Sequence, residues 1–479
     1  MKILKNYING EFINSGNDDF INDINPATGE IIALIPNSSE EDIQMAVNAC
    51  KNNKKWGLFT IQERASWLDK IADELEKRFD EIAILESKDT GKPISLARNV
   101  DAKRSVHNFR FFSNLAKSLD KVEFKMDDAI NNVLNKPVGI AGLITPWNLP
   151  LYLLSWKVAP ALIMGNCIIA KPSELTPLTA NLLAEVIDHI RLPKGVFNLV
   201  HGLGNKCGQA LVEHKEIGLI SFTGGTETGK IVAKTAAPMF KKISLELGGK
   251  NATIILKDAD LEKNMREIVR SAFLNQGQVC LCGSKILVHK SIYDTFIDKF
   301  IEKVSEMEIG NPLNEETDLG ALISLEHKIK VESYIELAKK EGGNLIYGGN
   351  KPELEEPFSN GAFLEPTIIT ELDYNSRTAT EEIFGPVVSI HPFTEINEAI
   401  KIANCTKYGL AASIWTQDIK TGEEIAKKLD TGMVWINCWL HRDLRVPFGG
   451  VKSSGVGREG GIYSLQFFSE LQNICTFYN

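Results

Sequence analysis

The chain contains few cysteines for its length, eight among 479 residues, and their spacing is irregular. A disulfide scaffold needs a denser set in a shorter chain, so the sequence argues against that class. The closest pair, Cys280 and Cys282, lacks the spacing of metal ligands, and none of the eight histidines forms a paired ligand motif with another. We therefore expect a reducing compartment, the cytoplasm, and no metal cofactor.

Long apolar runs are also missing. The most apolar stretch, residues 139–170, is interrupted by three prolines and by Lys157, so it cannot supply the ~20 apolar residues of a membrane-spanning helix. Residues 1–7 become polar too early to form the apolar core of a signal peptide. These features predict no membrane partner.

Blocks of like charge are absent as well. The net charge is −9 and the basic residues are scattered, so neither nucleic acid nor an anionic membrane is an expected partner and a small-molecule substrate fits better. Apolar residues make up 43% of the chain, as in ordinary globular proteins. A chain of 479 residues exceeds the ~250 to 300 residues at which single cores stop growing, which predicts two or three domains.

Short β-prone runs alternate with helical segments over most of the chain. The first set of expected strands comprises residues 139–143, 167–170, 195–199, 218–222 and 243–245. The pattern restarts after Gly248 with a strand at 252–256, a helix at 261–274, a strand at 285–289 and a helix at 293–307. This alternation predicts an α/β fold whose mainly parallel sheets are covered on both faces and bind ligands at the carboxyl ends of their strands.

The N-terminal quarter is expected to flank this core. Residues 1–38 predict short strands with a turn at 25–29, residues 39–89 predict two helices, and a third helix is expected at about 94–119. A polar, hairpin-like stretch follows to residue 136.

Residues 273–280, Phe-Leu-Asn-Gln-Gly-Gln-Val-Cys, end on a candidate nucleophile. A helix is expected to end just before this run, and Gly277 between two amides opens the chain into a loop that can present the Cys280 thiol. An isolated cysteine is more often a small buried apolar residue. Cys280 is not isolated, because its neighbours form a recognisable motif.

The run around Cys280 resembles the catalytic-cysteine signature of the aldehyde dehydrogenase superfamily. Residues 245–251, Leu-Glu-Leu-Gly-Gly-Lys-Asn, resemble the general-base signature of that superfamily, with Glu246 standing 34 positions before Cys280. Further matches to its motifs lie at residues 146–148, 171–174, 222–225, 382–386 and 447–450. Because these matches cover nearly the whole chain, it is identified as a member of the superfamily.

The resemblance implies an aldehyde-dehydrogenase-like fold with three parts. A Rossmann-like NAD-binding domain is expected at residues 1–116 and 136–247, and an α/β catalytic domain at 248–438. A small β oligomerisation arm is expected at 117–135 and 463–479, and a return segment at 439–462 that lines the substrate tunnel. The family assembles through such an arm, which implies a homodimer or a homotetramer.

The expected cofactor is NAD. Residues 171–174, Lys-Pro-Ser-Glu, follow an expected strand, where the adenosine half of a dinucleotide should lie. The Glu174 carboxylate can accept hydrogen bonds from both ribose hydroxyls and would repel a 2′-phosphate, which favours NAD over NADP; taken alone, Lys171 and Glu174 are more often a surface pair. Residues 222–229 link a strand to a helix whose N-terminus suits a pyrophosphate, although a simple Gly-rich turn fits that segment equally well.

By position in the family motifs, Glu382 and Phe384 would hold the nicotinamide ribose and ring. The other cofactor contacts that the resemblance implies are Thr145, Trp147, Lys171, Ser173, Glu174, Gly204, Gly224, Gly225, Gly229 and Leu247.

The resemblance also implies a covalent mechanism. Cys280 would attack the aldehyde to form a thiohemiacetal, whose oxyanion would be bound by the Asn148 side chain and the Cys280 backbone N–H. Hydride departure leaves a thioester, and Glu246 would activate the water that hydrolyses it. Alone, Asn148 could mark a structural turn and Glu246 a buried structural carboxylate. Family members that pass the acyl group to coenzyme A typically lack this glutamate, so a free acid is the expected product.

Residues 437–445 and 149–157 resemble the branch of 2-hydroxymuconic and 2-aminomuconic semialdehyde dehydrogenases. By family position, Arg104 and Arg442 border the substrate tunnel, which predicts a carboxylate on the substrate. The alternative is that Arg442 pairs with Asp443 at the surface and that Arg104 lies on a solvated helix face. The remaining expected substrate contacts are Leu149, Trp156 and Phe448.

Two other functions compete with this hypothesis. A betaine or other aliphatic aldehyde dehydrogenase is the nearest, although tunnel arginines would repel a quaternary amine. A non-catalytic scaffold, like the lens crystallins derived from this family, is disfavoured because Cys280, Glu246 and Asn148 are all present. The choice between amino and hydroxy substrates, and between dimer and tetramer, stays open.

Overall fold

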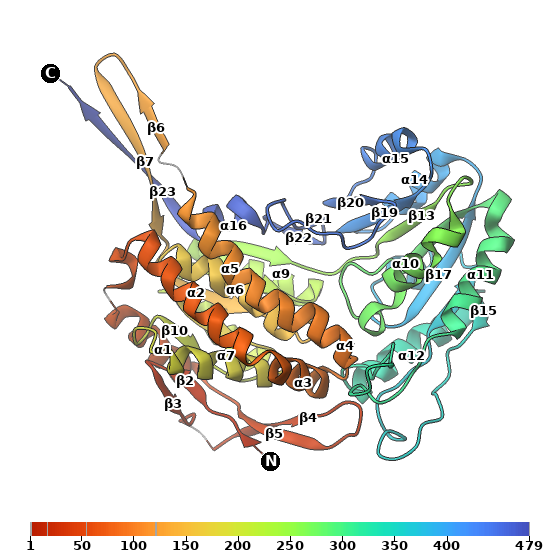
Figure 1. The fold of residues 1–479 in the computed structure, drawn as a ribbon, viewed down its shortest axis with the longest axis horizontal. Coiled ribbons are helices and arrows are strands. Elements are labelled where there is room, and N and C mark those ends of the chain that lie inside the picture. Colours follow the sequence, from red (N-terminus) through yellow and green to blue (C-terminus); the bar gives the residue numbers. More distant parts are fainter. Residues whose placement is uncertain (1, 17, 54, 120–121, 479) are drawn as a thin grey trace.

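The computed structural model describes residues 2–16, 18–53, 55–119 and 122–478. Residues 1, 17, 54, 120, 121 and 479, which fall in the predicted NAD-binding domain and arm, lie outside the described residues. Two large sheets flanked by helices form the body, and a thin ribbon of strands projects from it (Figure 1). The predicted α/β class is confirmed.

The first sheet has eight strands in the order β22-β12-β11-β8-β9-β10-β2-β3. Its five central strands are parallel: β8 (Ile140–Ile144), β9 (Cys167–Lys171), β10 (Phe197–Leu199), β11 (Leu219–Thr223) and β12 (Lys242–Glu246). Its antiparallel strands are β2 (Asn6–Ile8), β3 (Glu11–Ile13) and β22 (Gly455–Val456). The central strands are almost fully buried, which explains their continuous apolar runs and why they were predictable.

Helices and turns cover this sheet (Figure 1). They are α1 (Glu40–Asn52), η1 (Trp56–Leu58), α2 (Ile61–Lys77), α3 (Phe79–Thr90), α4 (Ile94–Leu96), the π-helix η2 (Ala97–Ala102), α5 (Lys103–Lys117), α6 (Pro150–Ile163), α7 (Leu178–His189), the π-helix η3 (Gly204–Gly208), α8 (Gln209–Glu213), α9 (Thr226–Ala236) and η4 (Ala237–Met239). A small sheet of order β1-β5-β4 contains β1 (Lys2–Ile3), β4 (Phe20–Ile24) and β5 (Ile31–Pro36).

The prediction of two helices over residues 39–89 is wrong, because the structure has three. The chain bends at Arg78, which leaves helical geometry at ψ 21° and forms ion pairs with Glu81 and Glu185. The apolar spacing continues across the bend because Leu75 and Ile82 are both buried in the same core. The single helix expected near 94–119 is confirmed as one continuous helical run from 94 to 117, in which the π-helical turn η2 joins α4 to α5.

The second sheet has seven strands in the order β15-β16-β17-β14-β13-β19-β20, all parallel to their neighbours except the edge strand β15. These strands are β13 (Ala252–Ile255), β14 (Lys285–His289), β15 (Asn344–Tyr347), β16 (Thr367–Thr370), β17 (Val387–Phe393), β19 (Ala411–Trp415) and β20 (Met433–Ile436). The surrounding elements are α10 (Leu261–Phe273), η5 (Leu274–Gly277), η6 (Lys290–Ile292), α11 (Tyr293–Ser305), α12 (Leu325–Lys340), α13 (Arg377–Thr380), α14 (Ile396–Asn404), α15 (Ile419–Ala426) and the short pair β18 (Tyr408–Gly409) and β21 (Val451–Lys452).

The projecting ribbon joins two distant parts of the chain. Strand β23 (Ser469–Phe477) pairs with β7 (Ala129–Pro137), which also pairs with β6 (Val122–Lys125). The predicted β character of the tail from residue 463 is wrong at its start, where α16 (Gly461–Phe467) is helical. Leu465 and Phe468, three positions apart, are both buried in the core of the first sheet, so this turn of helix is held by packing.

The strands of the two sheets follow the predicted division at residue 247, except for β22, which returns to the first sheet. The domain boundaries themselves stay a prediction. None of the helices within the described ranges is both long enough and apolar enough to cross a membrane.

Candidate active site

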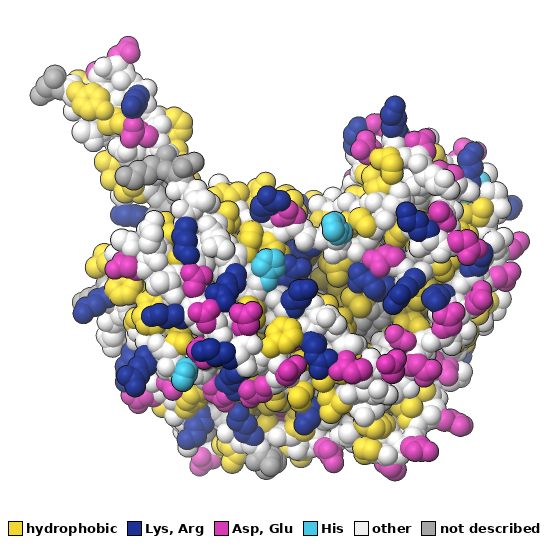
Figure 2. Space-filling view, viewed as in Figure 1, with side chains coloured by type: hydrophobic (Ala, Val, Ile, Leu, Met, Phe, Trp, Pro, Cys, Tyr) yellow, Lys and Arg dark blue, Asp and Glu magenta, His cyan; other side chains and the backbone are white. Residues whose placement is uncertain are grey.

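A pocket of about 280 Å³ opens between the parts that carry the two sheets. Figure 2 shows a recess in this region of the surface, with Lys and Arg side chains around it. The pocket is lined from one side by the ends of β11 and β12 and the start of α6, and from the other by the turn after α10. Cys280, Glu246 and Asn148, the three predicted catalytic residues, all line it.

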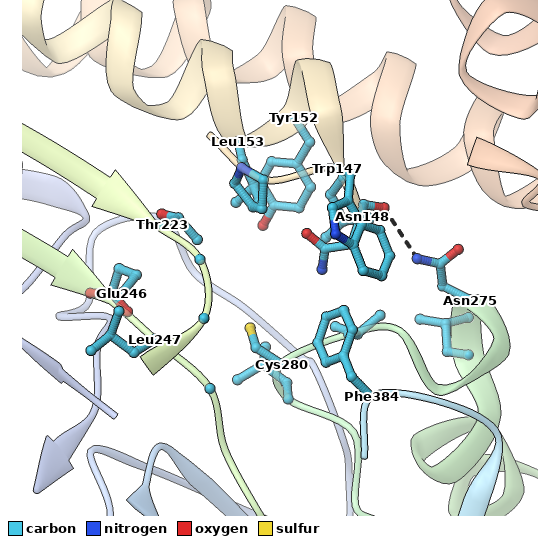
Figure 3. Close-up of a pocket in the computed structure, with 18 of the residues that line it drawn as sticks. Trp147, Asn148, Tyr152, Leu153, Thr223, Glu246, Leu247, Asn275, Cys280 and Phe384 are labelled. Atoms are coloured by element: carbon cyan, nitrogen blue, oxygen red, sulfur yellow. Dashed lines mark hydrogen bonds between the residues drawn. The ribbon is translucent and has the colours of Figure 1, made fainter. Parts of the chain in front are cut away.

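The loop that carries Cys280 is tightly constrained. After α10 ends, Asn275 and Gln276 adopt left-handed backbone conformations with φ of 53° and 55°, which are strained for residues with a Cβ. Gly277 follows at φ 70°, and a Cβ there would lie 2.2 Å from the carbonyl oxygen of Gly385. Only glycine fits that position. The result is a Cys280 thiol, partly exposed, that faces the pocket (Figure 3).

The surroundings of the Cys280 thiol favour its neutral form. Burial raises the pKa of this thiol, and the nearby carboxylates of Glu382 and Glu246 raise it further, while Arg442 acts in the opposite direction. Since the thiolate is the nucleophile, its formation requires a proton acceptor or an added positive charge in the pocket.

Asn148 lies between β8 and α6, beside the Cys280 loop. Its side-chain Nδ2 donates to the Gln278 carbonyl at 2.9 Å, and its own carbonyl accepts from Asn275 Nδ2 at 3.1 Å, the dashed bond in Figure 3. The side chain is 4% exposed. These contacts hold an uncharged amide donor next to the nucleophile, as an oxyanion-binding group requires.

Glu246 ends β12 and is almost fully buried, with no hydrogen-bond partner on either carboxylate oxygen among the described residues. Burial raises the pKa of Glu246 well above its ordinary value, and Glu459 adds to this, while Lys157 opposes it. Lys157 is itself paired with Glu459 at 2.6 Å. A Cβ at Gly449 would lie 2.8 Å from Glu246 Oε1, so this glycine leaves room for the carboxylate. A carboxylate with a raised pKa and free oxygens suits a general base.

Half of the predicted cofactor residues line the same pocket. They are Trp147, Gly224, Gly225, Leu247, Glu382 and Phe384. Gly249 N–H donates to Glu382 Oε1 at 2.9 Å and so fixes that carboxylate.

Groups that can bind a phosphate lie at the same end of the pocket. Helix α9 begins after Gly225 without a side-chain cap, so its first backbone N–H groups are available to an anion. The Thr223 hydroxyl is buried without a hydrogen-bond partner among the described residues.

The other predicted cofactor residues do not line the pocket: Thr145, Lys171, Ser173, Glu174, Gly204 and Gly229. Thr145 N–H donates to the Lys171 carbonyl at 3.2 Å, and Lys171 Nζ pairs with Glu174 Oε2 at 3.1 Å. These residues follow the neighbouring strands β8 and β9, and the Glu174 side chain is 28% exposed. A dinucleotide can therefore reach from Glu174, past the start of α9, to the pocket, and the residues present fit that group.

Among the predicted substrate residues, Leu149, Trp156, Arg442 and Phe448 line the pocket, whereas Arg104 does not. The Arg442 guanidinium lies 4.5 Å from the Trp156 ring centroid and 4.1 Å from that of Phe448. Asp443, the alternative partner of Arg442, instead forms a bidentate ion pair with Arg445.

Tyr152 joins the two predicted arginines. Its hydroxyl accepts from Arg442 Nη1 at 2.6 Å, and Arg104 lies over its ring at 5.8 Å. The other Arg442 nitrogen, Nη2, is buried and has no partner among the described residues. Burial lowers the pKa of Arg104, and the charge of Arg442 lowers it further. Arg104 is thus a half-buried charge behind Tyr152 and not a solvated one.

Sequence reasoning missed Tyr152 and His327. Tyr152 falls within the resembled run 149–157, so its position could have indicated it. His327 has no motif around it; its Nε2 lies 2.7 Å from the Phe384 carbonyl, and its ring contacts Trp147 edge-on at 5.3 Å. Burial lowers the pKa of His327 to about 4, so the neutral ring donates to that carbonyl. In the part of the chain that the structure describes, no three metal-ligating side chains form a cluster suited to an ion.

Comparisons with known proteins agree with this geometry. The sequence model described as "Aldehyde dehydrogenase family" matches residues 12–474. The 2-aminomuconic semialdehyde dehydrogenase of Mus musculus is 46% identical, over 99% of this chain and 98% of that one. The 2-hydroxymuconic semialdehyde dehydrogenase of Pseudomonas sp. (strain CF600) is 43% identical over 99% of both. A solved structure of betaine aldehyde dehydrogenase from Staphylococcus aureus in complex with NAD+ gives a TM-score of 0.96 at 38% identity, covering 99% of this chain and 95% of that one.

Proposed function

Since the chain belongs to the aldehyde dehydrogenase family, we propose that it uses NAD to oxidise 2-aminomuconic or 2-hydroxymuconic semialdehyde to the dicarboxylic acid. It has the fold of that family and is an aldehyde dehydrogenase. NAD is the cofactor of the similar solved structures, and Glu174 favours it over NADP. Such substrates arise in the breakdown of aromatic compounds.

The substrate assignment rests on Arg442 Nη2, which is buried in the pocket that holds Cys280 and has no hydrogen-bond partner among the described residues. A guanidinium deprived of water lacks hydrogen-bond acceptors, and a substrate carboxylate supplies them in the planar geometry that arginine binds best. Tyr152 fixes the other nitrogen of the fork, so the free one is held in place. The distal carboxylate of a semialdehyde would bind there and leave its aldehyde carbon for Cys280.

The residues of the chain divide the chemistry between them. Cys280 Sγ gives up its proton to the Glu246 carboxylate, which releases it to solvent, and attacks the aldehyde carbon. The resulting oxyanion accepts hydrogen bonds from the Asn148 amide and the Cys280 N–H. NAD, when bound, supplies the acceptor for the hydride that leaves this carbon. A thioester then remains on Cys280; Glu246 removes a proton from the attacking water, and the carboxylic acid and the thiolate separate. Lys157 and Glu459 form an ion pair whose two charges both act on the Glu246 carboxyl group.

Replacing Arg442 by leucine is expected to raise the KM for a muconic semialdehyde by about 10- to 100-fold, because a desolvated charge-assisted contact is lost. The KM for hexanal should stay unchanged. NADH formation with both aldehydes measures this. Arg445→Leu, three positions away and exposed in its pair with Asp443, is the matched control and should alter neither value. An unchanged KM for the semialdehyde in Arg442→Leu would remove the carboxylate-binding role.

The two competing functions give different results in the same assay. Preference for hexanal or betaine aldehyde would favour an aliphatic aldehyde dehydrogenase, although the charge of Arg442 in the pocket opposes a cationic substrate. NADH formation that survives complete alkylation of Cys280 would favour a scaffold without this catalytic site.

We also propose that the chain forms a homodimer or homotetramer in the cytoplasm. The arm strands β6, β7 and β23 expose Val122, Phe124, Leu471 and Phe477 by 45 to 66%, and a projecting ribbon with apolar side chains gains stability by packing on a second copy. All eight cysteines are free thiols, as a reducing compartment favours. Light scattering that gives the mass of one chain would contradict the assembly, and recovery of the protein outside the cytoplasmic fraction would contradict the location.

A further inference from the structure

Lys92 is a fully buried lysine beside the active site that the chemistry above does not use. It follows α3 in the turn at Gly91, and its side chain is 0% exposed. Its Nζ donates to Asp101 Oδ2 and to the backbone carbonyl of Asn148, both at 2.9 Å, and lies 3.8 Å from Glu86 Oε2. Burying an ammonium is costly unless it is well paired, and replacing such a pair by apolar residues often preserves stability. Stability alone therefore gives no good reason for a buried lysine at position 92.

We propose that Lys92 is a positioning residue for aldehyde oxidation: its ammonium group, with Asp101 as counter-ion, holds the backbone carbonyl of Asn148 and thereby aims the Asn148 amide at the oxyanion. This inference rests on the proposed function, in which Asn148 is the oxyanion donor. Lys92 acts only through Asn148 and contacts no reacting atom.

Three contacts hold Asn148 from different parts of the fold. Lys92 and Asn275 both donate to its carbonyl, the first from the turn after α3 and the second from the Cys280 loop. Its own Nδ2 donates to the Gln278 carbonyl in that loop. The carbonyl and the amide belong to one short residue, so a shift of the carbonyl moves the amide. Catalytic hydrogen bonds lose strength with displacements of a fraction of an ångström.

Residues around Lys92 also contact the segment that contains Asn148. Asp101 lies in the π-helix η2 and is 0% exposed; short π-helical turns inside helices are frequent at functional sites. Glu86 Oε1 accepts from the backbone N–H of Leu151 in the first turn of α6, at 2.9 Å. Asp101 is the closer counter-ion of Lys92, because its Oδ2 lies 2.9 Å from Lys92 Nζ whereas Glu86 Oε2 lies 3.8 Å away. Burial raises the pKa of both carboxyl groups. The Gly91 carbonyl accepts from Ala321 N–H at 2.9 Å, which ties this turn to the segment that precedes α12.

A double-mutant cycle between Lys92 and Asn148 tests the inference. Lys92→Met is expected to lower kcat by about 10- to 100-fold, with KM for the semialdehyde within about threefold, because an oxyanion contact acts in the transition state. In the Asn148→Ala background the same change should lower kcat by no more than about twofold, since the group it positions is gone. Equal losses in both backgrounds, or a loss confined to KM, would overturn the role of Lys92.

The same cycle separates this inference from the proposed function. If Asn148→Ala leaves kcat unchanged, Asn148 is not the oxyanion donor, and that assignment and the role of Lys92 both fail. If Asn148→Ala lowers kcat and the cycle is additive, only the role of Lys92 fails.

Two further variants guard against a loss caused by misfolding. Lys92→Met combined with Asp101→Asn removes both charges of the closest ion pair, so that Asp101 is not left buried without its partner; it should show the same non-additivity with Asn148→Ala, and additivity would overturn the proposal. Lys285→Met is the matched control, because Lys285 is also 0% exposed and donates to the backbone carbonyls of Tyr374 and Ile402 far from Asn148. It should lower Tm and behave additively with Asn148→Ala.

The reactivity of Cys280 toward iodoacetamide provides a readout besides turnover. Lys92 contacts Asn148 and not the thiol. Lys92→Met should therefore leave the alkylation rate within about twofold of wild type. A large change in that rate would mean that the whole Cys280 loop has moved, and would overturn a role confined to Asn148.

Discussion

Replacing Cys280 by alanine is expected to abolish NADH formation, with kcat lower by at least about ten-thousandfold, because the thiohemiacetal and the thioester both form on its sulfur. Glu382 and Glu246 are carboxylates in the same pocket whose charges act on the thiol, and neither replaces the sulfur in this chemistry. The folded structure should be retained, since removing one sulfur from a partly exposed position leaves the pocket in place. Steady-state NADH formation and far-UV circular dichroism measure the two effects.

Cys282 supplies the matched control two positions away. Its thiol is buried, at 3.7 Å from the Leu274 carbonyl, and 5% exposed. Cys282→Ala should keep most of the activity and lose a little stability, as a small core truncation does. If Cys280→Ala retained turnover and Cys282→Ala lost it, the nucleophile would be the second thiol.

Replacing Glu246 by glutamine is expected to leave the first half of the reaction and stop the second. Rapid mixing should give a burst of about one NADH per active site, followed by a steady rate about 100- to 10,000-fold below wild type, because general-base catalysis of hydrolysis is lost while the thioester still forms. Intact-mass measurement after the burst should show the acyl group on Cys280. A full steady rate in Glu246→Gln would place the base elsewhere.

The raised pKa of Glu246 gives this prediction a pH signature. The base acts only when ionised, so hydrolysis should slow as the pH falls through that raised pKa, at a higher pH than an ordinary carboxyl group would show. In Glu246→Gln this limb of the kcat profile should disappear. If the kcat of the wild-type enzyme fell only at the pKa of an ordinary carboxyl group, a buried Glu246 with a raised pKa would not be the base.

The free energy of unfolding should depend on pH in the opposite direction to the rate of hydrolysis. Between the ordinary and the raised pKa, the folded state holds a proton on Glu246 that the unfolded chain has released, so stability falls as the pH rises through this interval. Glutamine removes that dependence, and Glu246→Gln should be at least as stable as wild type at neutral pH. Denaturant unfolding at several pH values measures it.

Much of the architecture was predictable because its signals are local. The strands from residue 139 to 245 are buried on both faces, which makes them short continuous apolar runs that the sequence displays directly. The turn around Gly277 was predictable for a similar reason, since its backbone geometry excludes other residues. The bend at Arg78 was not, because the apolar spacing continues across it and the ion pairs of Arg78 with Glu81 and the distant Glu185 form only in the folded chain.

The sequence by itself determined the α/β class and, through motifs, named Cys280, Glu246 and Asn148 as the candidate catalytic residues. Only the tertiary structure decided which arginine lines the pocket. Arg442 is enclosed by Trp156, Phe448 and Tyr152, which come from segments some 290 positions away or from a neighbouring turn, while Asp443 binds Arg445. Likewise, only the folded chain brings Lys92 within hydrogen-bond distance of the Asn148 carbonyl, 56 positions away. Burial and hydrogen-bond partners between distant segments are set by how the elements pack, and a chain read position by position carries no local signal for them.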